Sequence, residues 1–427
     1  MDFGIYEGAV KSQVGGASFS EETFETISAE IDAWDDDLRQ LNLDIHDHPE
    51  LMFEEYYAHD TLTSFMASDS NEWVVKQRQF GLETAWSATF THGTGGRTLG
   101  VNSEMDALPA IGHACGHNLI ATAGVAVALA VKAAMIKHDI PGKVVLLGTP
   151  AEEGGAGKVF MLNAGAYDTM DACIMCHPSP GRKNETGIRS SLANQHFKVT
   201  YTGHTAHAAA APWEGKNAMD AAILAYTNVS LLRQQIHPSH RVHGVFEGEN
   251  LAVNIIPDKV NMHWLIRAPT SAGVQDTASR VKACFEAAAL ATGCKADIAE
   301  TGFPMNEMRQ NRVLGAEFAR TWRAKFGNCV EAYDETMFAS TDFGNVTHAL
   351  PALHPGYSIP SVPNGGNHTA LFAYAASTPE AHKATLEVAK ALANTGLRLL
   401  SDDFFFTEVK AAYEADKKMA GFSDIWS

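Results

Sequence analysis

The sequence contains few cysteines, and their spacing does not suggest a disulfide framework. Six occur among 427 residues, whereas proteins that depend on disulfides carry them densely in short chains. Most of the six are therefore expected to be buried thiols. Cys115 differs from the others, because one histidine lies two residues before it and another lies two residues after it.

Long apolar segments and basic residues are also scarce. No stretch reaches the roughly 18 uncharged apolar residues of a membrane-spanning helix, and the N-terminal residues lack the basic and apolar regions of a secretory signal. We therefore expect a soluble, cytoplasmic protein with no membrane partner. Lys and Arg number 32 against 50 Asp and Glu, for a formal net charge of -18. Nucleic acids are bound through clustered Lys and Arg, so no nucleic-acid partner is expected.

The chain is long enough for two domains, because a single hydrophobic core rarely grows beyond about 250 to 300 residues. Residues 20–66 have the apolar spacing of helices. After them, three strand-like runs alternate with helix-like segments. The runs are TLGVNSEMDALP, GKVVLLGTPAEE and DACIMCHP. This alternation predicts an α/β fold whose sheet has parallel strands and is covered on both faces.

Polar residues follow each of these strand-like runs. Asp106 comes after the first, Glu152 and Glu153 come after the second, and His177 ends the third. Ligands of such sheets gather beyond the carboxyl ends of the strands. The sequence therefore predicts that three separate segments bring polar side chains to one sheet edge.

A different pattern occupies residues 195–304. Strand and helix signals follow in the order β, α, β, β, α, β, which is typical of a ferredoxin-like α+β domain. We therefore predict a catalytic domain in two parts, residues 1–194 and 305–427, interrupted by an inserted domain at residues 195–304.

The segment GHACGHN places His113, Cys115 and His117 at intervals of two residues. In extended backbone their side chains would share one face, and thiolate and imidazole are good ligands for zinc and similar metals. The alternative is a polar loop that precedes a helix, with Cys115 as a buried thiol.

The pair Glu152 and Glu153 strengthens the metal hypothesis. Adjacent side chains point in different directions, so one can bind a metal while the other takes a proton from water. A solvated acidic turn is the alternative. His177 and His368, the latter in NGGNHTALF, are each more often ordinary histidines than ligands, but their occurrence with the Cys/His and Glu pairs favours a metal site.

These motifs resemble those of the M20 family of metallopeptidases and amidohydrolases. EMDALP, HACGHN, GTPAEEGG, the strand-end histidine and NHTALF occur in the family's order, and the resemblance extends over nearly the whole chain. It is strongest to the subgroup of M20 domain-containing protein 2 and the aminobenzoyl-glutamate hydrolases. The resemblance implies a zinc-peptidase-like catalytic domain with a mixed central sheet and a ferredoxin-like dimerisation (lid) domain.

The resemblance also implies roles for individual residues. One or two divalent metals, most often zinc but also manganese or cobalt, would be bound by Cys115, His117, Glu153, His177 and His368. Glu152 would be the general base, and Asp106 would orient a ligand. In a homodimer, His207 would stabilise the oxyanion in a neighbouring active site. Asn254 and Arg267 would hold the substrate.

Two departures limit what can be transferred from the family. Many members have His-x-Asp where this chain has Glu104-Met105-Asp106, and many have Asp where it has Asn118. The expected activity is hydrolysis of the amide bond of a dipeptide or N-acyl amino acid with a free carboxylate. Alternatives are a narrow amidase for aryl amides such as aminobenzoyl-glutamate, a non-catalytic binding protein, and a metal-free thiol hydrolase with Cys115 as nucleophile.

Overall fold

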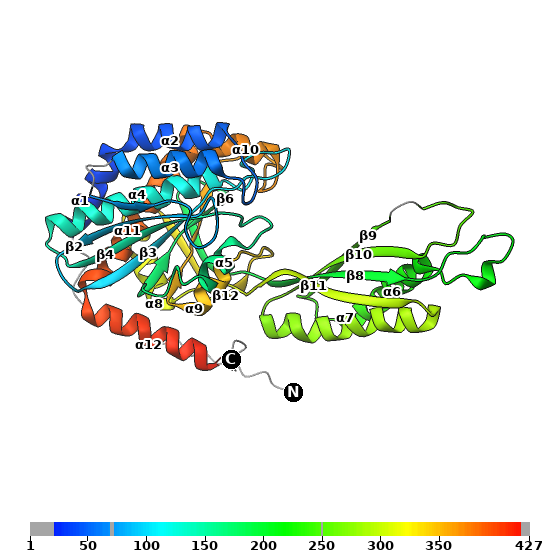
Figure 1. Ribbon diagram of the computed structural model, residues 1–427. Helices are drawn as coiled ribbons and strands as arrows, with labels where there is room; N and C mark the ends of the chain where they lie inside the picture. The colour runs from blue at the N-terminus through cyan, green and yellow to red at the C-terminus, as the bar shows by residue number, and fades with distance from the viewer. Residues whose placement is uncertain (1–20, 69–71, 249–250, 420–427) are drawn as a thin grey trace.

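The computed structural model describes residues 21–68, 72–248 and 251–419. Figure 1 shows two bodies, a large one and an elongated one that projects from it. Three helices begin the large body, as the N-terminal periodicity predicted. They are α1 (Glu21–Ala33), α2 (Asp35–Asp47) and α3 (Tyr56–Ser68).

A six-stranded sheet forms the centre of the large body. Strand β3 runs parallel to β4 and β5, whereas β2 is antiparallel to β4, so the predicted mixed sheet is confirmed. In the order β1-β2-β4-β3-β5-β13 the strands are Val74–Lys76, Trp86–His92, Gly142–Thr149, Arg97–Glu104, Ala172–Ile174 and Ala352–Leu353.

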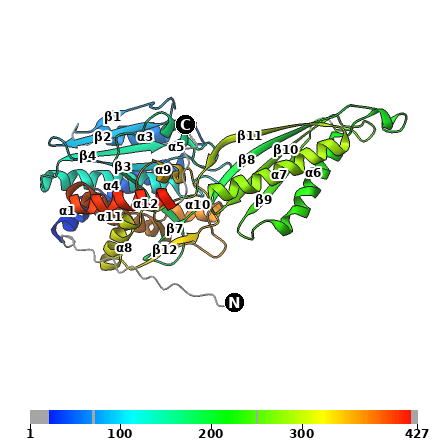
Figure 2. The same cartoon turned by 90° about the horizontal axis from the view of Figure 1, so that it is seen from below.

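Helices cover both faces of this sheet. On one face, Ser103 in β3 donates a hydrogen bond to the Ala121 carbonyl of α4 (His117–Lys137). The long helix α11 (Pro379–Ser401) packs beside α4 (Figure 2). On the other face, the next side chain of β3, Glu104, contacts α5 (Gly157–Asn163). Strand β3 is therefore buried on both sides, and its polar residues Asn102, Ser103 and Glu104 are buried together with Leu99 and Val101.

Contrary to the expectation from the sequence, one described helix, α4, is long and apolar enough, by length and composition alone, to cross a membrane. The mean hydropathy of its most apolar 18-residue segment is 2.2, but 89% of this segment is buried inside the protein. A helix that is apolar all round and enclosed by other elements is the core helix of a packed domain.

A second sheet in the large body was not predicted. Its order is β12-β7-β14-β6, and its strands are Asn328–Thr336, Glu185–Ser190, Gly356–Ile359 and His177–Pro180. Around the two sheets lie α8 (Arg312–Lys325), α9 (Phe343–Ala349), α10 (Ala370–Ala376) and α12 (Asp403–Met419).

The elongated body has the predicted element order and a core of its own. Its sheet, β11-β8-β10-β9, is antiparallel throughout. Phe197 and Trp264 are paired across two strands and pack with the helices. The elements are β8 (Ala193–Thr202), α6 (Ala218–Leu232), β9 (Arg241–Glu247), β10 (Lys259–Ala268), α7 (Ser271–Thr292) and β11 (Lys295–Met305). We keep residues 195–304 as the proposed extent of this inserted domain.

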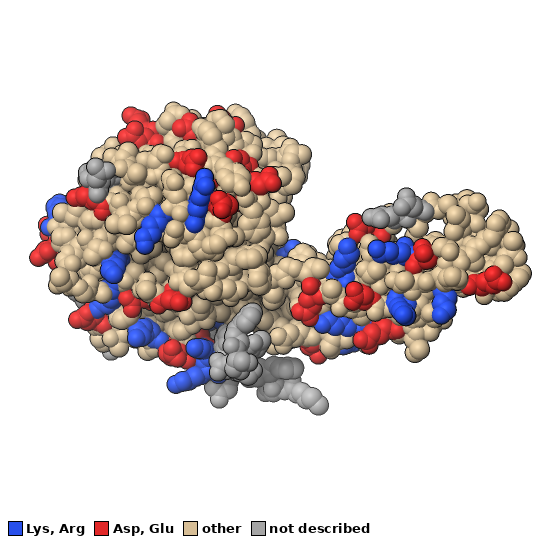
Figure 3. All heavy atoms as spheres, in the orientation of Figure 1, with Lys and Arg blue, Asp and Glu red and all other residues tan. Residues whose placement is uncertain are grey.

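The surface of the two domains carries mixed charge. On the face shown in Figure 3, acidic and basic side chains are interspersed over both bodies. A wide gap separates the two bodies above the narrow region that joins them. The net negative charge of the chain is therefore not gathered into one patch on this face.

Gly148 provides a test of how tightly the C-terminal end of β4 packs against its neighbours. A Cβ at this position would overlap the indole ring of Trp86, which is fully buried. We expect Gly148→Ala to lower the free energy of unfolding by about 1 to 3 kcal/mol through overpacking, measured by urea denaturation. Gly187→Ala, where the nearest atom lies 3.6 Å from the added Cβ, is the matched control. Equal effects of the two substitutions would contradict the packing described here.

Candidate functional site

The parallel strands β3 and β4 end at the same edge of the central sheet. Glu104 is in register with Thr149, so the segments that follow both strands start side by side. Asp106 follows β3, and Glu152 and Glu153 follow β4. The prediction that these residues lie at one sheet edge is confirmed by the strand register.

The segment before α4 is not extended, and this corrects the expectation that three alternating side chains share a face. Gly116 has a left-handed φ of 82°, and α4 begins at His117. This turn brings Cys115 and His117 together but leaves His113 apart, buried with its ring centroid 6.4 Å from that of His46. A Cβ at Gly116 would approach Pro178 Cγ to 2.6 Å, so the close approach of the two segments requires glycine.

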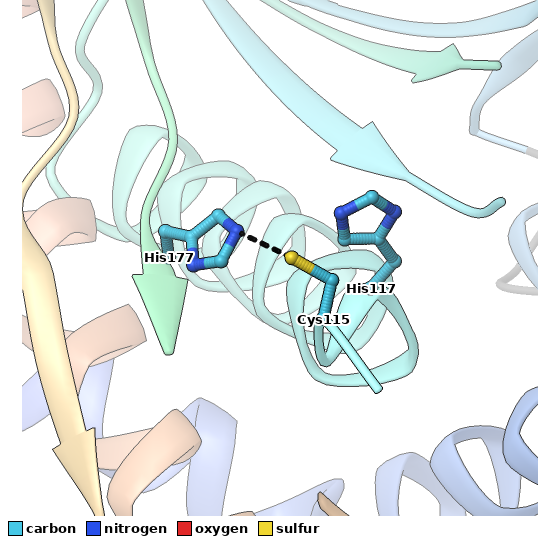
Figure 4. Close-up of side chains that lie close together, drawn as sticks. All are labelled: Cys115, His117 and His177. Carbon is cyan, nitrogen blue, oxygen red and sulfur yellow. Dashed lines mark hydrogen bonds between the residues drawn. The ribbon is translucent and has the colours of Figure 1, made fainter. Parts of the chain in front are cut away.

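Cys115, His117 and His177 form a first group of possible metal ligands. Each offers one ligand atom, and the three atoms lie within 4.8 Å of one another. Figure 4 shows the three side chains converging, with a contact of 3.4 Å between Cys115 Sγ and His177 Nε2. His177 is the first residue of β6 and not the end of a strand, because the apolar run after Met170 splits between the two sheets.

Both histidines of this group are held through Nδ1. His177 Nδ1 donates to the Pro178 carbonyl at 2.8 Å, and His117 Nδ1 lies 3.1 Å from Asp106 Oδ1. Such contacts fix the orientation of the ring and leave Nε2 free for a metal.

A second group consists of Cys115, Glu153 and His368, whose ligand atoms also lie within 4.8 Å of one another. His368 Nε2 lies 3.4 Å from Glu153 Oε1. The backbone N–H of His368 donates to the Ala114 carbonyl at 2.8 Å, which ties its loop to the one that carries Cys115. The two groups share only Cys115, so its sulfur is the atom placed to contact both positions.

A third group contains His117, Glu152 and Glu153. His117 Nε2 lies 3.9 Å from one carboxylate oxygen of each glutamate. Glu152 is therefore beside the ligand groups but belongs to neither of the two that contain Cys115.

Asp106 connects the two loops that carry these residues. One oxygen contacts His117, and the other accepts a hydrogen bond from the backbone N–H of Glu153 at 2.9 Å. Asp106 is itself buried. These are the contacts that the predicted orienting role requires.

The donor atoms suit a divalent metal. Among the described residues, His117 Nε2 and Glu153 Oε1 are buried and have no hydrogen-bond partner. Two nitrogen or oxygen ligands of a tetrahedral zinc ion, each about 2.0 to 2.1 Å from it, lie about 3.4 Å apart, which matches the His368 to Glu153 contact. A mixed set of sulfur, imidazole and carboxylate ligands fits zinc and other borderline metals.

Electrostatics around the site favour a neutral Glu152 when no cation is bound. Burial raises the pKa of Glu152 well above its usual value, and the nearby carboxylates of Glu104 and Asp342 raise it further. Burial also raises the pKa of Cys115 to about 12. Burial alone would lower the pKa of His117, but Asp106 and Glu104 outweigh it and raise this pKa well above the usual value.

The three residues predicted on the inserted domain lie in different places. Arg267, near the end of β10, donates to Ser340 Oγ at 2.7 Å and lies close enough to Glu152 to feel its charge. His207 and Asn254 are exposed and lie beyond the opposite end of β8, where the Ala208 N–H donates to the Asn254 carbonyl. The structure therefore brings Arg267 to the site of its own chain but not His207 or Asn254.

Comparison with known proteins identifies the family. The model of peptidase family M20/M25/M40 matches residues 100–394. The chain belongs to this family. It is therefore a metal-dependent hydrolase of amide bonds with the predicted fold, and the alternative of a non-catalytic binding protein is set aside.

Individual relatives narrow the comparison. The chain is 41% identical over 382 residues to the Xaa-Arg dipeptidase of Mus musculus. This alignment covers 87% of this chain and 87% of the relative. It is 28% identical to one component of the p-aminobenzoyl-glutamate hydrolase of Escherichia coli (strain K12), over 87% of this chain and 90% of the relative. A dinuclear metal-binding peptidase of the M20 family from Bacillus subtilis has the same fold, with a TM-score of 0.66 and 18% identity over 86% of this chain and 99% of that one.

Sequence reasoning missed two buried features of this M20 peptidase site. Glu55 accepts hydrogen bonds from the backbone N–H groups of Phe53 and Ala151 and from Thr84 Oγ1, so it holds the loop that leads to Glu152. Lys158 contacts the carboxylates of Glu104 and Asp342. Neither residue stands in a sequence pattern that signals a site, because their partners are distant in the chain.

Glu55 gives a prediction about pH and stability. Burial raises its pKa to about 7 from 4.5, so the folded state binds more protons than the unfolded state between these values and stability falls as pH rises through them. Glutamine does not titrate, so the Glu55→Gln variant should not show this pH-dependent loss of stability. We expect the free energy of unfolding of the variant, minus that of wild type, to increase by about 2 to 3 kcal/mol between pH 4.5 and pH 7. Urea denaturation of metal-free protein measures it.

The matched control is Glu54→Gln, which removes one carboxylate at the exposed neighbouring residue. A stability difference between Glu55→Gln and wild type that stays constant from pH 4.5 to 8 would show that burial of Glu55 does not have the stated effect.

Proposed function

We propose that this protein hydrolyses dipeptides or N-acyl amino acids whose leaving side carries a free carboxylate. The observation that carries the proposal is the pair of ligand groups that share Cys115, with a buried carboxylate, Glu152, beside them. One or two divalent ions would be held by Cys115, His117, Glu153, His177 and His368. Zinc fits this donor set best, and manganese or cobalt would also be accepted.

Bound divalent ions supply two effects, a lower pKa for water and polarisation of the substrate carbonyl. The residues of the chain do the rest. Glu152 takes a proton from the attacking water and passes it to the leaving amine. Its burial and the neighbouring carboxylates keep its proton affinity high, which suits a group that must first accept a proton and then release it.

Arg267 is the proposed partner of the substrate carboxylate. A guanidinium can fork onto a carboxylate with two hydrogen bonds. Within the described part of the chain, Arg267 donates one hydrogen bond, from Nη1 to Ser340 Oγ. The 41% identical mouse relative is an Xaa-Arg dipeptidase, which supports a dipeptide substrate. Dipeptides with a C-terminal arginine therefore belong in the first assay panel, together with N-acyl amino acids.

His207 is proposed to act in the active site of a second subunit of a homodimer. Strand β8 has 10 residues, which span roughly 33 Å, and His207 lies beyond the end that is farther from its own catalytic domain. Its Nδ1 accepts hydrogen bonds from the backbone N–H groups of Ala209 and Ala210, each at 3.1 Å. The proton of the neutral ring is therefore on Nε2, which can donate to an oxyanion. Asn254, which lies beside it, would contact the same bound substrate.

An aryl-amide amidase is the second candidate. It is favoured by the likeness to the component of the aminobenzoyl-glutamate hydrolase, which extends over most of both chains at 28% identity. Both candidates use the same metal and the same base, so only parallel assays of dipeptides, acyl amino acids and aryl amides separate them.

We further propose that the protein acts in the cytoplasm.

A metal-free thiol mechanism is disfavoured. The attacking species in such a mechanism is a thiolate, whereas burial raises the pKa of Cys115 to about 12. At neutral pH the metal-free protein therefore carries a protonated thiol at this position.

Glu152→Gln separates metal binding from catalysis. The wild-type protein is expected to lose activity on chelation and to recover it with zinc, manganese or cobalt. The variant should keep the wild-type metal content but lose about 10² to 10⁴ in kcat, because proton transfer is removed. Metal content by mass spectrometry and hydrolysis of the substrate panel measure both effects.

Glu153→Gln is the matched control for this experiment, since it alters the adjacent carboxylate and is expected to lower the metal content. Activity that survives both chelation and Glu152→Gln would contradict the proposed mechanism and point to Cys115.

Mixed dimers test the placement of His207. Glu152→Gln and His207→Ala subunits, each inactive alone, are co-expressed with different tags and the mixed dimer is purified. If His207 acts in the neighbouring site, one of the two sites of each mixed dimer contains both intact residues, and about half of the wild-type activity returns. If His207 acts in its own chain, no site is intact and the mixed dimer stays inactive.

A further inference from the structure

The inserted domain contacts the catalytic domain beside the loop that carries Glu152. Strand β11 crosses the narrow region that joins the two bodies (Figure 1), and its residue Phe303 lies against Phe160 of α5. The two ring centroids are 4.7 Å apart, with an angle of 90° between the ring planes, which is the edge-to-face arrangement that aromatic pairs favour. Helix α5 follows the loop of Glu152 directly, so a side chain of the inserted domain packs on the element that ends this loop.

An irregularity in β11 precedes Phe303. The register with β8 shifts between Thr301 and Met305, and Gly302 in this bulge has a left-handed φ of 68°. Such a φ favours glycine, and a bulge re-aims the side chains beside it. The regular pairing of β11 is therefore interrupted at the place where Phe303 meets the catalytic domain.

Phe160 also contacts Phe53, with ring centroids 5.7 Å apart and an angle of 88° between the rings. Phe53 packs on the loop of Glu152, because a Cβ at Gly155 would lie only 2.4 Å from Phe53 Cε2. Phe303, Phe160 and Phe53 thus form an aromatic column. It begins in the inserted domain and ends on the turn that contains Glu152.

Phe53 and the loop are also connected through hydrogen bonds. Glu55 Oε1 accepts from the backbone N–H groups of both Phe53 and Ala151. Phe53 has a left-handed φ of 64°, which is unfavourable for a residue other than glycine and persists only where its surroundings hold it. A displacement of Phe53 would therefore disturb the hydrogen bond of Ala151, the residue before Glu152.

The three rings of the column contribute little to the domain cores. Phe160 is 38% exposed. Among the described residues, the buried hydrophobic clusters include none of the three rings. Loss of one ring is therefore expected to change the position of the loop more than the stability of either core.

We propose that Phe303 is a positioning residue for hydrolysis, which holds the loop of Glu152 in place through the aromatic column. The inserted domain then acts on the base of its own chain, separately from His207, which is assigned to a second subunit. This inference rests on the proposed function, since it requires that Glu152 is the base. A displacement of about 1 Å can lower a catalytic rate about 100-fold, so a small movement of this loop is enough.

Phe303→Ala tests the proposal, with Phe246→Ala as the matched control. Phe246 pairs with Tyr226 inside the inserted domain, at 5.6 Å between ring centroids, and is 44% exposed. Phe303→Ala is expected to lower kcat by about 10- to 100-fold and to leave KM and metal content unchanged. Phe303→Tyr, which keeps the ring, and Phe246→Ala should both retain the wild-type kcat.

A double-mutant cycle with Phe160→Ala tests whether Phe303 acts through the column. Phe160→Ala removes the middle ring, so adding Phe303→Ala to it should cause no further loss of kcat. Independent losses that multiply in the double variant would overturn the proposed route.

Hydrogen exchange of the metal-free protein needs no substrate. The backbone N–H groups of Ala151, Gly155 and Gly157 are hydrogen-bonded, and their exchange reports local opening of the loop. Exchange over residues 150–157 is expected to be about 10-fold faster in Phe303→Ala than in wild type and unchanged in Phe246→Ala. Equal exchange rates and equal kcat in the two variants would overturn the inference and leave the proposed function intact. A wild-type protein that hydrolyses no member of the substrate panel would overturn the proposed function, and the positioning role with it.

Discussion

The arrangement of the site depends on the carboxylate of Asp106, which contacts two ligand-bearing loops at once. One oxygen orients the ring of His117, and the other accepts the backbone N–H of Glu153. The contact is possible because parallel β3 and β4 end in register at one edge of the sheet. The buried side chain of Asp106 thereby fixes His117, at the start of α4, relative to Glu153, after the end of β4, before any metal is present.

The second constraint is the concentration of buried charge behind this contact. Glu104, Glu152 and Asp342 lie near one another, and Lys158 is the ammonium that contacts two of them. Charges of this kind persist in a protein interior only when they are paired or bind metals. The catalytic base therefore sits in a field of negative charge that raises its pKa, and the same field attracts divalent cations to the adjacent ligands.

Much of the fold could be predicted from the sequence, because strand-like segments such as that of β4 alternate with apolar helical segments, and the polar residues that follow these strands are conspicuous. The metal-binding motifs were visible for the same reason. The second sheet was missed, since β6 and β14 have only four residues each. The pairing of Lys158 with Glu104 and Asp342 was also invisible, because these residues are separated by 54 and 184 positions. His113 was misplaced because residues 113–115 form a turn, in which the Gly116 N–H donates to the His113 carbonyl, and not the assumed extended backbone.

The measurement that tests this account most directly is a crystal structure of the protein grown with zinc, with anomalous data collected on both sides of the zinc absorption edge. The account predicts two anomalous peaks in each protomer, both within bonding distance of Cys115 Sγ, one beside His117 and His177 and the other beside Glu153 and His368. Absence of zinc at Cys115, or an ion bound only to surface residues, would contradict the account.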